Sequence, residues 1–421
     1  MKKKLRKFFK LFGPGFITGA SDDDPSGIAT YAQTGAIFGY GQLWTALFSF
    51  PFMTVMQEMC GRIGLVTGKG LSGVIRRHYS KTLLYGAVLL LLVANSINIG
   101  ANLGAMAASI RLLVDVPFVF LLLLITAITL ILEIFITYRV YARYLKYLTL
   151  ALLAYVATAF VVRQDWSTIA ASTFLPSISP TKEYLMNIVA ILGTTISPYL
   201  FFWQTSEEVE EEVAEKKLRI MGMGKPRLNA RAISRMRLDT VFGMLFSNLI
   251  MFFIILTTAS TLHLHGISEI QTAAQAAEAL RPLAGDFAFL IFALGIVGAG
   301  FLAVPVLAGS ASYALAEAFG WREGLYLKLK QAHGFYGVIT IATLLGLLIN
   351  FTPITSFEML YYTAILNGIV APPLMIIIML ISNNKKIMGK HTNTRVSNVL
   401  GWLITGFMFV AAVALLVSIV L

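Results

Sequence analysis

Long apolar runs separated by short polar stretches recur along the whole chain. Each run is long enough to cross the hydrocarbon core of a bilayer as a helix, which takes about 20 residues. Eleven such runs lie at residues 13–37, 42–61, 83–110, 116–138, 144–162, 186–206, 238–260, 285–318, 334–350, 355–382 and 396–420. The longest polar stretch between them, residues 206–237, leaves no room for a soluble domain. The pattern predicts an all-α multi-pass membrane protein in which residues 1–421 form one transmembrane domain.

Polar residues interrupt the first apolar run near its centre. Asp22, Asp23 and Asp24 are followed by Pro25 and Gly27, with apolar sequence on both sides. Acidic side chains at this depth usually bind an ion or line an aqueous path, and proline removes a helical hydrogen bond and frees backbone carbonyls. The pattern favours a broken helix with a cation site over an acidic loop outside the membrane. Asp24 is the best ligand candidate because it adjoins the break.

A second interruption appears five runs later. Residues 193–199 read Gly-Thr-Thr-Ile-Ser-Pro-Tyr, again between apolar stretches. A lone Pro198 would be an ordinary kink, but paired interruptions at corresponding places in two halves indicate an inverted-repeat transporter with its site at mid-membrane. The repeats are expected at about residues 13–162 and 186–382, with an extra helix at 396–420.

The distribution of charge predicts the orientation. The net charge is +12, with 57% hydrophobic and 13% charged residues. If the N-terminus is cytoplasmic, all but four of the 33 Lys and Arg fall on the cytoplasmic side, the exceptions being Arg111, Arg163, Lys182 and Arg281. This asymmetry follows the positive-inside rule and favours a multi-pass protein of the inner (plasma) membrane over a nucleic-acid-binding protein. The single cysteine, Cys60, excludes an internal disulfide.

Several motifs carry a family resemblance. Asp24-Pro25-Ser26-Gly27 matches an Asp-Pro-Gly-Asn motif, and Gln57 through Arg62-Ile63-Gly64 to Leu71 matches the stretch after a second helix. Ser197-Pro198-Tyr199 stands where the family has Met-Pro-His, and Gly298-Ala299-Gly300 and Ala308-Gly309-Ser310 fit an eighth segment. The chain thus resembles the NRAMP family of divalent metal transporters. The resemblance implies a LeuT-like fold of 5+5 inverted repeats with broken helices 1 and 6, and transport of a divalent metal ion.

Two departures from the family pattern concern the metal. In the family the ion is held by the Asp, the Asn and a Met thioether, whereas here Gly27 and Ser197 replace the Asn and the Met. Loss of a soft sulfur ligand removes discrimination toward Mn²⁺ and Fe²⁺ over hard ions, and a wider oxygen-lined cavity suits Mg²⁺, which tends to keep its water. The pattern is similar to that of the NRAMP-related magnesium transporters of bacteria. It predicts Mg²⁺ as the transported ion, with Mn²⁺ as a further candidate.

Proton coupling is predicted to be weak or absent. Tyr199 replaces the family histidine, and the third span carries the amides Asn95, Asn98 and Asn102 where the family has acids. Neutral amides do not relay protons near neutral pH, although Asn98 and Asn102 can line a hydrated cavity. The alternative is an ordinary proton-coupled Mn²⁺ or Fe²⁺ carrier with substituted ligands.

Other polar residues in the spans have two interpretations each. Glu133 either supplies charge along the path or pairs with an arginine such as Arg139 or Arg143. Asn367 is either a ligand or an interhelical hydrogen-bonding residue. Asp22 and Asp23 either form the outer approach or cap the second half-helix, and Asp23 remains a candidate ligand.

The spacing of Glu58 and Arg62 predicts a salt bridge on one helix face. The acidic run from Glu207 to Glu215 is interpreted as a solvated helix end with mixed-sign pairs, except for Glu207 and Glu208, which lie nearest the membrane. The alternative is an acidic cytoplasmic mouth that concentrates cations.

Two other function classes are disfavoured. A LeuT-fold carrier of organic solutes would receive a substrate carboxylate at the half-helix ends, and three aspartates there would repel it. An intramembrane aspartyl protease needs two carboxylates that share a proton, yet no Gly-x-Gly-Asp signature is present. The expected protein is therefore not an enzyme and needs no cofactor besides the transported ion. Its expected partners are that ion and the lipid bilayer, and it is expected to be a monomer.

Overall fold

The computed structural model describes residues 13–136, 149–179, 181–224, 226, 228 and 230–420, and these are nearly all helical. The main helices are α2 (Pro14–Asp22), α3 (Pro25–Phe38), α4 (Trp44–Thr67), α5 (Leu71–His78), α6 (Lys81–Arg111), α7 (Phe118–Phe135), α9 (Leu153–Val161), α10 (Trp166–Phe174), α11 (Lys182–Thr195), α12 (Pro198–Ala214), α13 (Ala230–Thr261), α16 (Ala288–Phe319), α17 (His333–Ile349), α18 (Ser356–Asn383) and α20 (Arg395–Val420). Short helices α14 (Ala273–Glu278), α15 (Arg281–Ala284) and α19 (Lys385–Met388) and 3₁₀ turns connect them.

The helices follow the predicted apolar runs closely. The run at 83–110 corresponds to α6, for example, and the run at 396–420 to α20. Part of the fifth predicted run, residues 144–148, lies outside the described residues. Within the described part of the chain, seven helical stretches are long and apolar enough to cross a membrane. The broken first helix and α4 fall outside that set, as do two shorter apolar stretches, Leu150–Val161 and His333–Ile349 (α17).

Both predicted breaks are present. Helix α2 ends at Asp22 and α3 begins at Pro25, so that Asp23 and Asp24 form the first break. Helix α11 ends at Thr195 and α12 begins at Pro198, which places Ile196 and Ser197 in the second break. In each case proline occupies the first position of the second half-helix, where its missing N–H costs no hydrogen bond.

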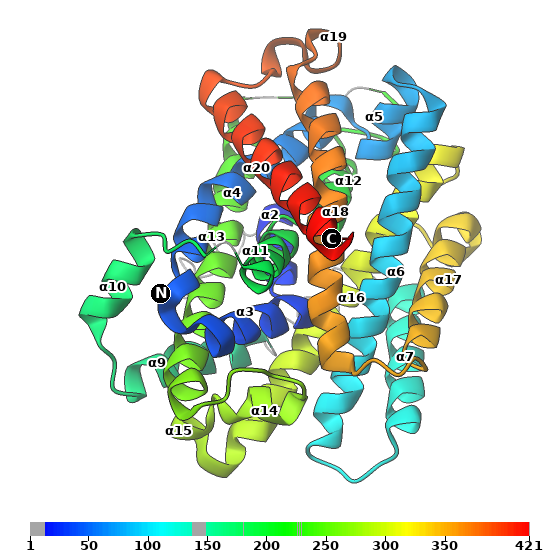
Figure 1. The fold of residues 1–421 in the computed structure, drawn as a ribbon. Coiled ribbons are helices and arrows are strands. Elements are labelled where there is room, and N and C mark those ends of the chain that lie inside the picture. The colour runs from blue at the N-terminus through cyan, green and yellow to red at the C-terminus, as the bar shows by residue number, and fades with distance from the viewer. Residues whose placement is uncertain are drawn as a thin grey trace, which may run out of the picture.

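The half-helices pack in two layers. Helix α2 begins on the side predicted to face the cytoplasm, which we call the inner side; α3 continues to the outer side. The outer halves α3 and α11 contact each other, the inner halves α2 and α12 do the same, and α13 packs against both α2 and α3. In Figure 1, α5 and α19 lie at the inner end at the top, and α14 and α15 lie at the outer end at the bottom. The two breaks therefore meet near the middle of the molecule.

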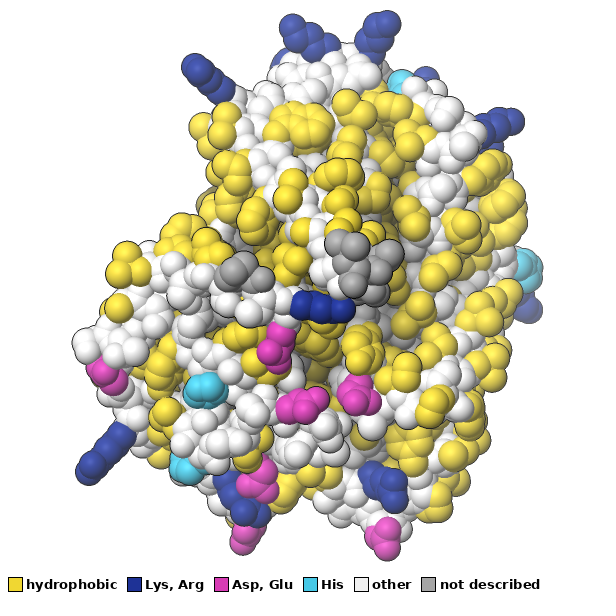
Figure 2. Space-filling model, in the orientation of Figure 1, with side chains coloured by type: hydrophobic (Ala, Val, Ile, Leu, Met, Phe, Trp, Pro, Cys, Tyr) yellow, Lys and Arg dark blue, Asp and Glu magenta, His cyan; other side chains and the backbone are white. Residues whose placement is uncertain are grey.

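Glycines allow the closest of these contacts. A Cβ atom on Gly19 of α2 would lie 2.3 Å from the backbone of Gly243 in α13. Hence the two helix backbones touch, as small residues permit in membrane proteins. The exterior is largely apolar; basic side chains project from the inner end at the top of the view, and acidic side chains lie in its lower half (Figure 2). Large exposed hydrophobic side chains lie along α6, α7, α13, α17 and α20, as expected for a surface that faces lipid.

Candidate metal site at the two helix breaks

Asp24 lies at the centre of the first break and caps α3. Its Oδ1 atom accepts hydrogen bonds from the Ser26 hydroxyl (2.6 Å) and the Gly27 amide (2.8 Å), and Oδ2 accepts one from the Asn102 amide nitrogen (3.1 Å). The side chain is buried. Three donors together with the positive end of α3 stabilise a carboxylate at this position. The N-cap is thus Asp24 itself, and the expectation that Asp22 or Asp23 caps α3 is wrong.

Two amides of α6 extend the site. The Asn102 Nδ2 group donates to the Asn98 side-chain oxygen (2.9 Å) and backbone carbonyl (2.8 Å), and the Thr363 hydroxyl of α18 lies 3.4 Å from the same Asn98 side-chain oxygen. Asn102 Oδ1 and Asn98 Nδ2 are buried with no hydrogen-bond partner among the described residues. Since buried polar atoms are normally paired, these two atoms mark a place for water or a hydrated ion beside Asp24.

The second break adjoins the first. The Ser197 hydroxyl donates to the carbonyls of Gly193 (2.9 Å) and Thr194 (2.7 Å), while the Tyr199 hydroxyl donates to the Ser21 carbonyl (3.2 Å). A Cβ atom on Gly27 would lie 3.1 Å from the Thr194 hydroxyl oxygen. Gly27 therefore sits where the two broken helices touch, and any larger residue there would occupy space between them.

The other two aspartates face a different helix. The Ser247 hydroxyl of α13 lies 2.6 Å from Asp22 Oδ2 and 3.1 Å from Asp23 Oδ1. Asp24 instead contacts α6 through Asn102. The side chains of Asp22 and Asp23 thus bond to α13, and that of Asp24 to α6.

Two candidate ligands form no hydrogen bond with Asp24 in the part of the chain that the structure describes. Glu133 of α7 is buried, and neither carboxylate oxygen has a hydrogen-bond partner among the residues that the structure describes. The suggested partners Arg139 and Arg143 lie outside those residues. Asn367 is buried in α18, and its amide nitrogen likewise has no partner within the described part of the chain. No group of three or more His, Cys, Asp and Glu side chains suited to a metal occurs in the part of the chain that the structure describes. Any ion at the breaks would therefore rely on one carboxylate together with amides, carbonyls and water.

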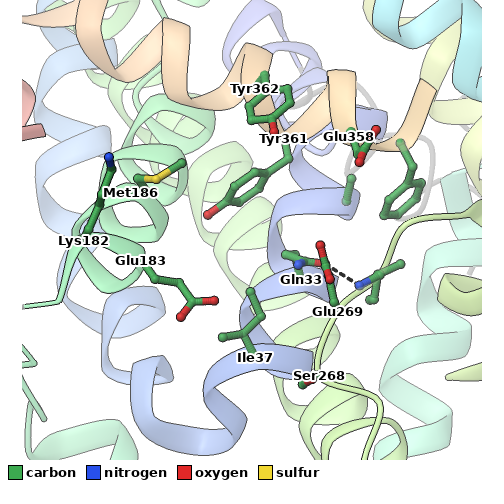
Figure 3. Close-up of a pocket in the computed structure, with 13 residues that line it drawn as sticks. Gln33, Ile37, Lys182, Glu183, Met186, Ser268, Glu269, Glu358, Tyr361 and Tyr362 are labelled. Carbon is green, nitrogen blue, oxygen red and sulfur yellow. Dashed lines mark hydrogen bonds between the residues drawn. The ribbon is translucent and has the colours of Figure 1, made fainter. Parts of the chain in front are cut away.

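An outer cavity of about 620 Å³ lies between α3, α11, α18 and the 268–270 loop (Figure 3). Ala29, Gln33 and Ile37 line it at intervals of four residues, so that one face of α3 leads from the cavity toward Pro25. Glu183, Glu269 and Glu358, together with Lys182, also line it. No sequence motif marks these three glutamates, because they come from loop and helix ends that are distant in sequence.

The inner side is closed by contrast. The Glu317 carboxylate at the end of α16 accepts hydrogen bonds from the Gly70 amide (2.6 Å) and the Gly73 amide (2.8 Å) at the start of α5. Glu210 of α12 accepts one from the Leu325 amide in the loop after α16. These carboxylates join α5, α12 and α16 across the inner end of the molecule.

The acidic run of α12 is less exposed than expected. Glu215 does form mixed-sign pairs, with Lys217 (2.6 Å) and Arg235 (3.2 Å). The interpretation of a solvated helix end is nevertheless wrong for Glu210 and Glu212, because both are buried, as are Glu207 and Glu208, which that interpretation excepted. The predicted Glu58–Arg62 bridge is present, with a distance of 3.0 Å between Arg62 Nε and Glu58 Oε1.

Comparison with known proteins agrees with this architecture. A family model described as natural resistance-associated macrophage protein-like (Nramp) matches residues 15–418. Similar curated proteins include the divalent metal cation transporter MntH of Caldanaerobacter subterraneus subsp. tengcongensis, 25% identical over 97% of this chain and 92% of its own length. The divalent metal cation transporter MntH of Klebsiella pneumoniae is 26% identical over 94% of this chain and 90% of its own length.

Solved structures show the fold. A manganese transporter of Eremococcus coleocola superposes with a TM-score of 0.73 at 16% identity, covering 97% of this chain and 85% of its own. MhsT in complex with L-phenylalanine gives 0.58 at 14% identity, covering 96% and 97%. The predicted LeuT-like fold is confirmed, as is a multi-pass membrane protein, and the curated relatives are transporters rather than enzymes, as expected for this chain. With a family match over nearly its whole length, the chain belongs to the Nramp family.

Proposed function

We propose that the chain moves a divalent cation across the membrane in a partly hydrated form, with Mg²⁺ as the main ion and Mn²⁺ as a second substrate. The curated relatives are named divalent metal cation transporters, which supports the general class. The observation that carries the choice of ion is the set of groups around Asp24. They are one carboxylate and two amides, and Asn102 Oδ1 is buried with no partner in the described part of the chain.

These groups favour a hard, hydrated ion. Water molecules around Mg²⁺ donate hydrogen bonds, and Asp24, the Asn102 side-chain oxygen and backbone carbonyls at the breaks can accept them. Position 197, where the family has methionine, carries a serine hydroxyl directed at backbone carbonyls. A thioether would favour softer metals, and this position offers none.

The same residues support uncoupled transport. Asn98 and Asn102 are neutral, and the Tyr199 hydroxyl is engaged with the Ser21 carbonyl. With no histidine at position 199, the membrane potential would supply the driving force, at about 4.6 kcal/mol for two charges over 100 mV. We place the protein in the plasma membrane with its N-terminus in the cytoplasm. The ion would enter by the outer cavity and leave after the Glu317 and Glu210 contacts open.

Purified protein in liposomes tests the proposal. A Mg²⁺-sensitive dye and a pH dye inside report the two fluxes, and Mn²⁺ is added as a competitor. We expect Mg²⁺ influx without acidification, competition by Mn²⁺, and loss of influx in Asp24→Asn with normal thermal stability. Asp286→Asn, at an exposed position, is the matched control and should transport normally. Mn²⁺ influx with acidification and no Mg²⁺ influx would instead establish a proton-coupled manganese carrier.

A further inference from the structure

A groove at the inner end of the molecule is separate from the helix breaks and from the outer cavity. It has a volume of about 560 Å³ and is formed by the end of α18, the start of α20 and the loop between α5 and α6. Helices α18 and α20 pack against each other beside α19 (Figure 1). Three of the side chains that line the groove are amides and two are aromatic: Asn383, Asn384, Asn398, Tyr79 and Trp402.

The lining changes from polar to apolar toward the middle of the membrane. Helix α18 ends at the inner side and α20 begins there, so that this direction leads back along α18 and forward along α20. On α18, Met379 lies four residues deeper than Asn383, and on α20, Trp402 lies four residues deeper than Asn398. Four residues are about one helical turn, on the same face and about 6 Å further in. The amides thus lie at the depth of lipid headgroups, and Trp402 at the interface below them, where tryptophan is favoured.

Two of the amides have donors to offer. The Asn384 side-chain oxygen accepts a hydrogen bond from the Lys386 amide (2.9 Å), and that of Asn398 accepts one from Asn393 Nδ2 (2.9 Å). Asn384 also bonds to the Tyr79 side chain. Because an amide NH₂ group carries two hydrogens, both side chains can still donate to an acceptor in the groove. A ligand with several acceptor oxygens, such as a phosphate group, fits these donors.

The segments around the groove carry basic residues and no acidic ones. No Asp or Glu occurs in residues 59–114 or 359–421. Four cations in these segments are exposed, adjoin the lining residues in sequence and take part in none of the ion pairs found between described residues: Lys81, Lys385, Lys386 and Arg395. Basic side chains also project from this end of the molecule in Figure 2. The charge around the groove therefore suits an anion.

We propose that this groove binds an anionic phospholipid from the inner leaflet. Its phosphate would lie at Asn384, Asn398 and the lysines of α19, and an acyl chain would follow the exposed Leu380 and Trp402 side chains. Basic pockets between membrane helices bind headgroups of this kind. A basic loop alone attracts anionic lipid without fixing it, whereas here donors, cations and an apolar wall occupy one groove. The inference does not depend on which ion the protein carries.

Counting bound lipid tests the inference. Full-length protein in a neutral detergent is titrated with phosphatidylglycerol or phosphatidylcholine of the same acyl chains, and complexes are counted by native mass spectrometry. We expect one phosphatidylglycerol to bind at least about fivefold more tightly than phosphatidylcholine. Lys385→Gln with Lys386→Gln should remove most of this preference, and Asn398→Leu, which keeps the charge, should weaken it. The matched control is Lys328→Gln with Lys330→Gln, which removes two exposed charges outside the groove and should bind as the wild type does.

Several outcomes would overturn the site. Equal binding of the two lipids by the wild type would exclude recognition of the headgroup charge. Equal losses in the two double variants would assign the preference to the overall charge of the inner end rather than to the groove. Displacement of the lipid by glycerol 3-phosphate would identify the ligand as a soluble phosphate, whereas retention supports a phospholipid. If Asn398→Leu lowers the thermal midpoint, Trp402→Ala replaces it, and undiminished lipid binding in that variant would also count against the groove.

Discussion

The residues that follow Asp24 in sequence determine the local environment of its carboxylate. Pro25 begins the half-helix, so that the first amides of α3 point back at the carboxylate, and Gly27 donates one of them. The same short motif brings the helix N-terminus and a charged ligand to one point. The Asn102 side-chain amide donates a hydrogen bond to the other carboxylate oxygen. The Asp24 carboxylate is therefore already hydrogen-bonded before an ion approaches it.

Restoring a soft ligand should change the ion preference. In Ser197→Met, the new thioether would lie at the second break, and soft metal ions gain affinity from sulfur. We expect Cd²⁺ to inhibit Mg²⁺ uptake at about tenfold lower concentration, which corresponds to roughly 1.4 kcal/mol, while Mg²⁺ uptake itself falls. Ser197→Leu, of similar size without sulfur, is the control. Equal sensitivity of both variants to Cd²⁺ would show that sulfur at this position does not select the ion.

The broken helices depend on close packing with their neighbours. Gly193, four residues before Ser197, faces α18: a Cβ atom there would lie 2.0 Å from the Ala364 carbonyl oxygen and 2.3 Å from the Gly368 amide nitrogen. Both contacts are with backbone atoms, which cannot rotate away. The position of the second break relative to α18 is therefore fixed by a pair of glycines.

An added methyl group at this contact should destabilise the folded protein. We expect Gly193→Ala to reduce the free energy of unfolding by about 1–3 kcal/mol, because overpacking displaces backbone, and to lower the thermal midpoint in detergent. Gly337→Ala in α17 is the matched control, since no atom lies within 4 Å of its added Cβ. Equal thermal midpoints for the two variants would mean that α11 and α18 can move apart without loss of stability.

The loop that closes the inner side should respond to pH. Burial and the charges of Glu317 (α16) and Glu210 (α12) raise the pKa of the Glu323 carboxyl well above its usual range, while Lys69, before α5, opposes them. The closed form therefore favours the protonated Glu323 carboxyl. This contribution to the stability of the closed form is present at low pH and is lost as the pH rises through the raised pKa of Glu323. We expect hydrogen exchange of residues 320–328, corrected for intrinsic rates, to increase with pH in the wild type but not in Glu323→Gln. Asp286→Asn should keep the wild-type dependence, and a wild-type response that survives Glu323→Gln would assign the effect to another group.

Local patterns predicted the elements but not their long-range contacts. Both breaks fall at the prolines that the sequence indicated, because proline and adjacent polar residues act within one turn. Burial of Glu210 could not be predicted, since it depends on the Leu325 amide, 115 residues away. The contacts of Ser247 with Asp22 and Asp23 span 225 and 224 residues. Those contacts form only when the helices pack against one another, and local patterns in one sequence do not determine how the helices pack.

At the scale of the whole molecule, the two sides of the breaks differ. The outer side holds the cavity between α3, α11 and α18, and the inner side is joined by carboxylate contacts among α5, α12 and α16. An ion arriving from outside meets acidic side chains, which gather in the lower half of the view in Figure 2. Clefts that carry one sign of charge raise the local concentration of oppositely charged substrates. The outer cavity is thus suited to collect cations before they reach Asp24.

Charge in this cavity should alter capture of the ion without altering its translocation. Glu183 and Glu269 are exposed and line the cavity. We expect their joint replacement by glutamine to raise the KM for Mg²⁺ severalfold at low ionic strength, with unchanged maximal rate, because fewer charges attract the ion. Lys182→Gln, at the same cavity, should lower KM, since it removes a repelling charge. Both effects should vanish near 1 M salt, where charges are screened within about 3 Å. A KM change that persists at high salt, or a fall in maximal rate, would instead place these glutamates in direct contact with the ion, and the cavity would then be part of the binding site rather than its approach.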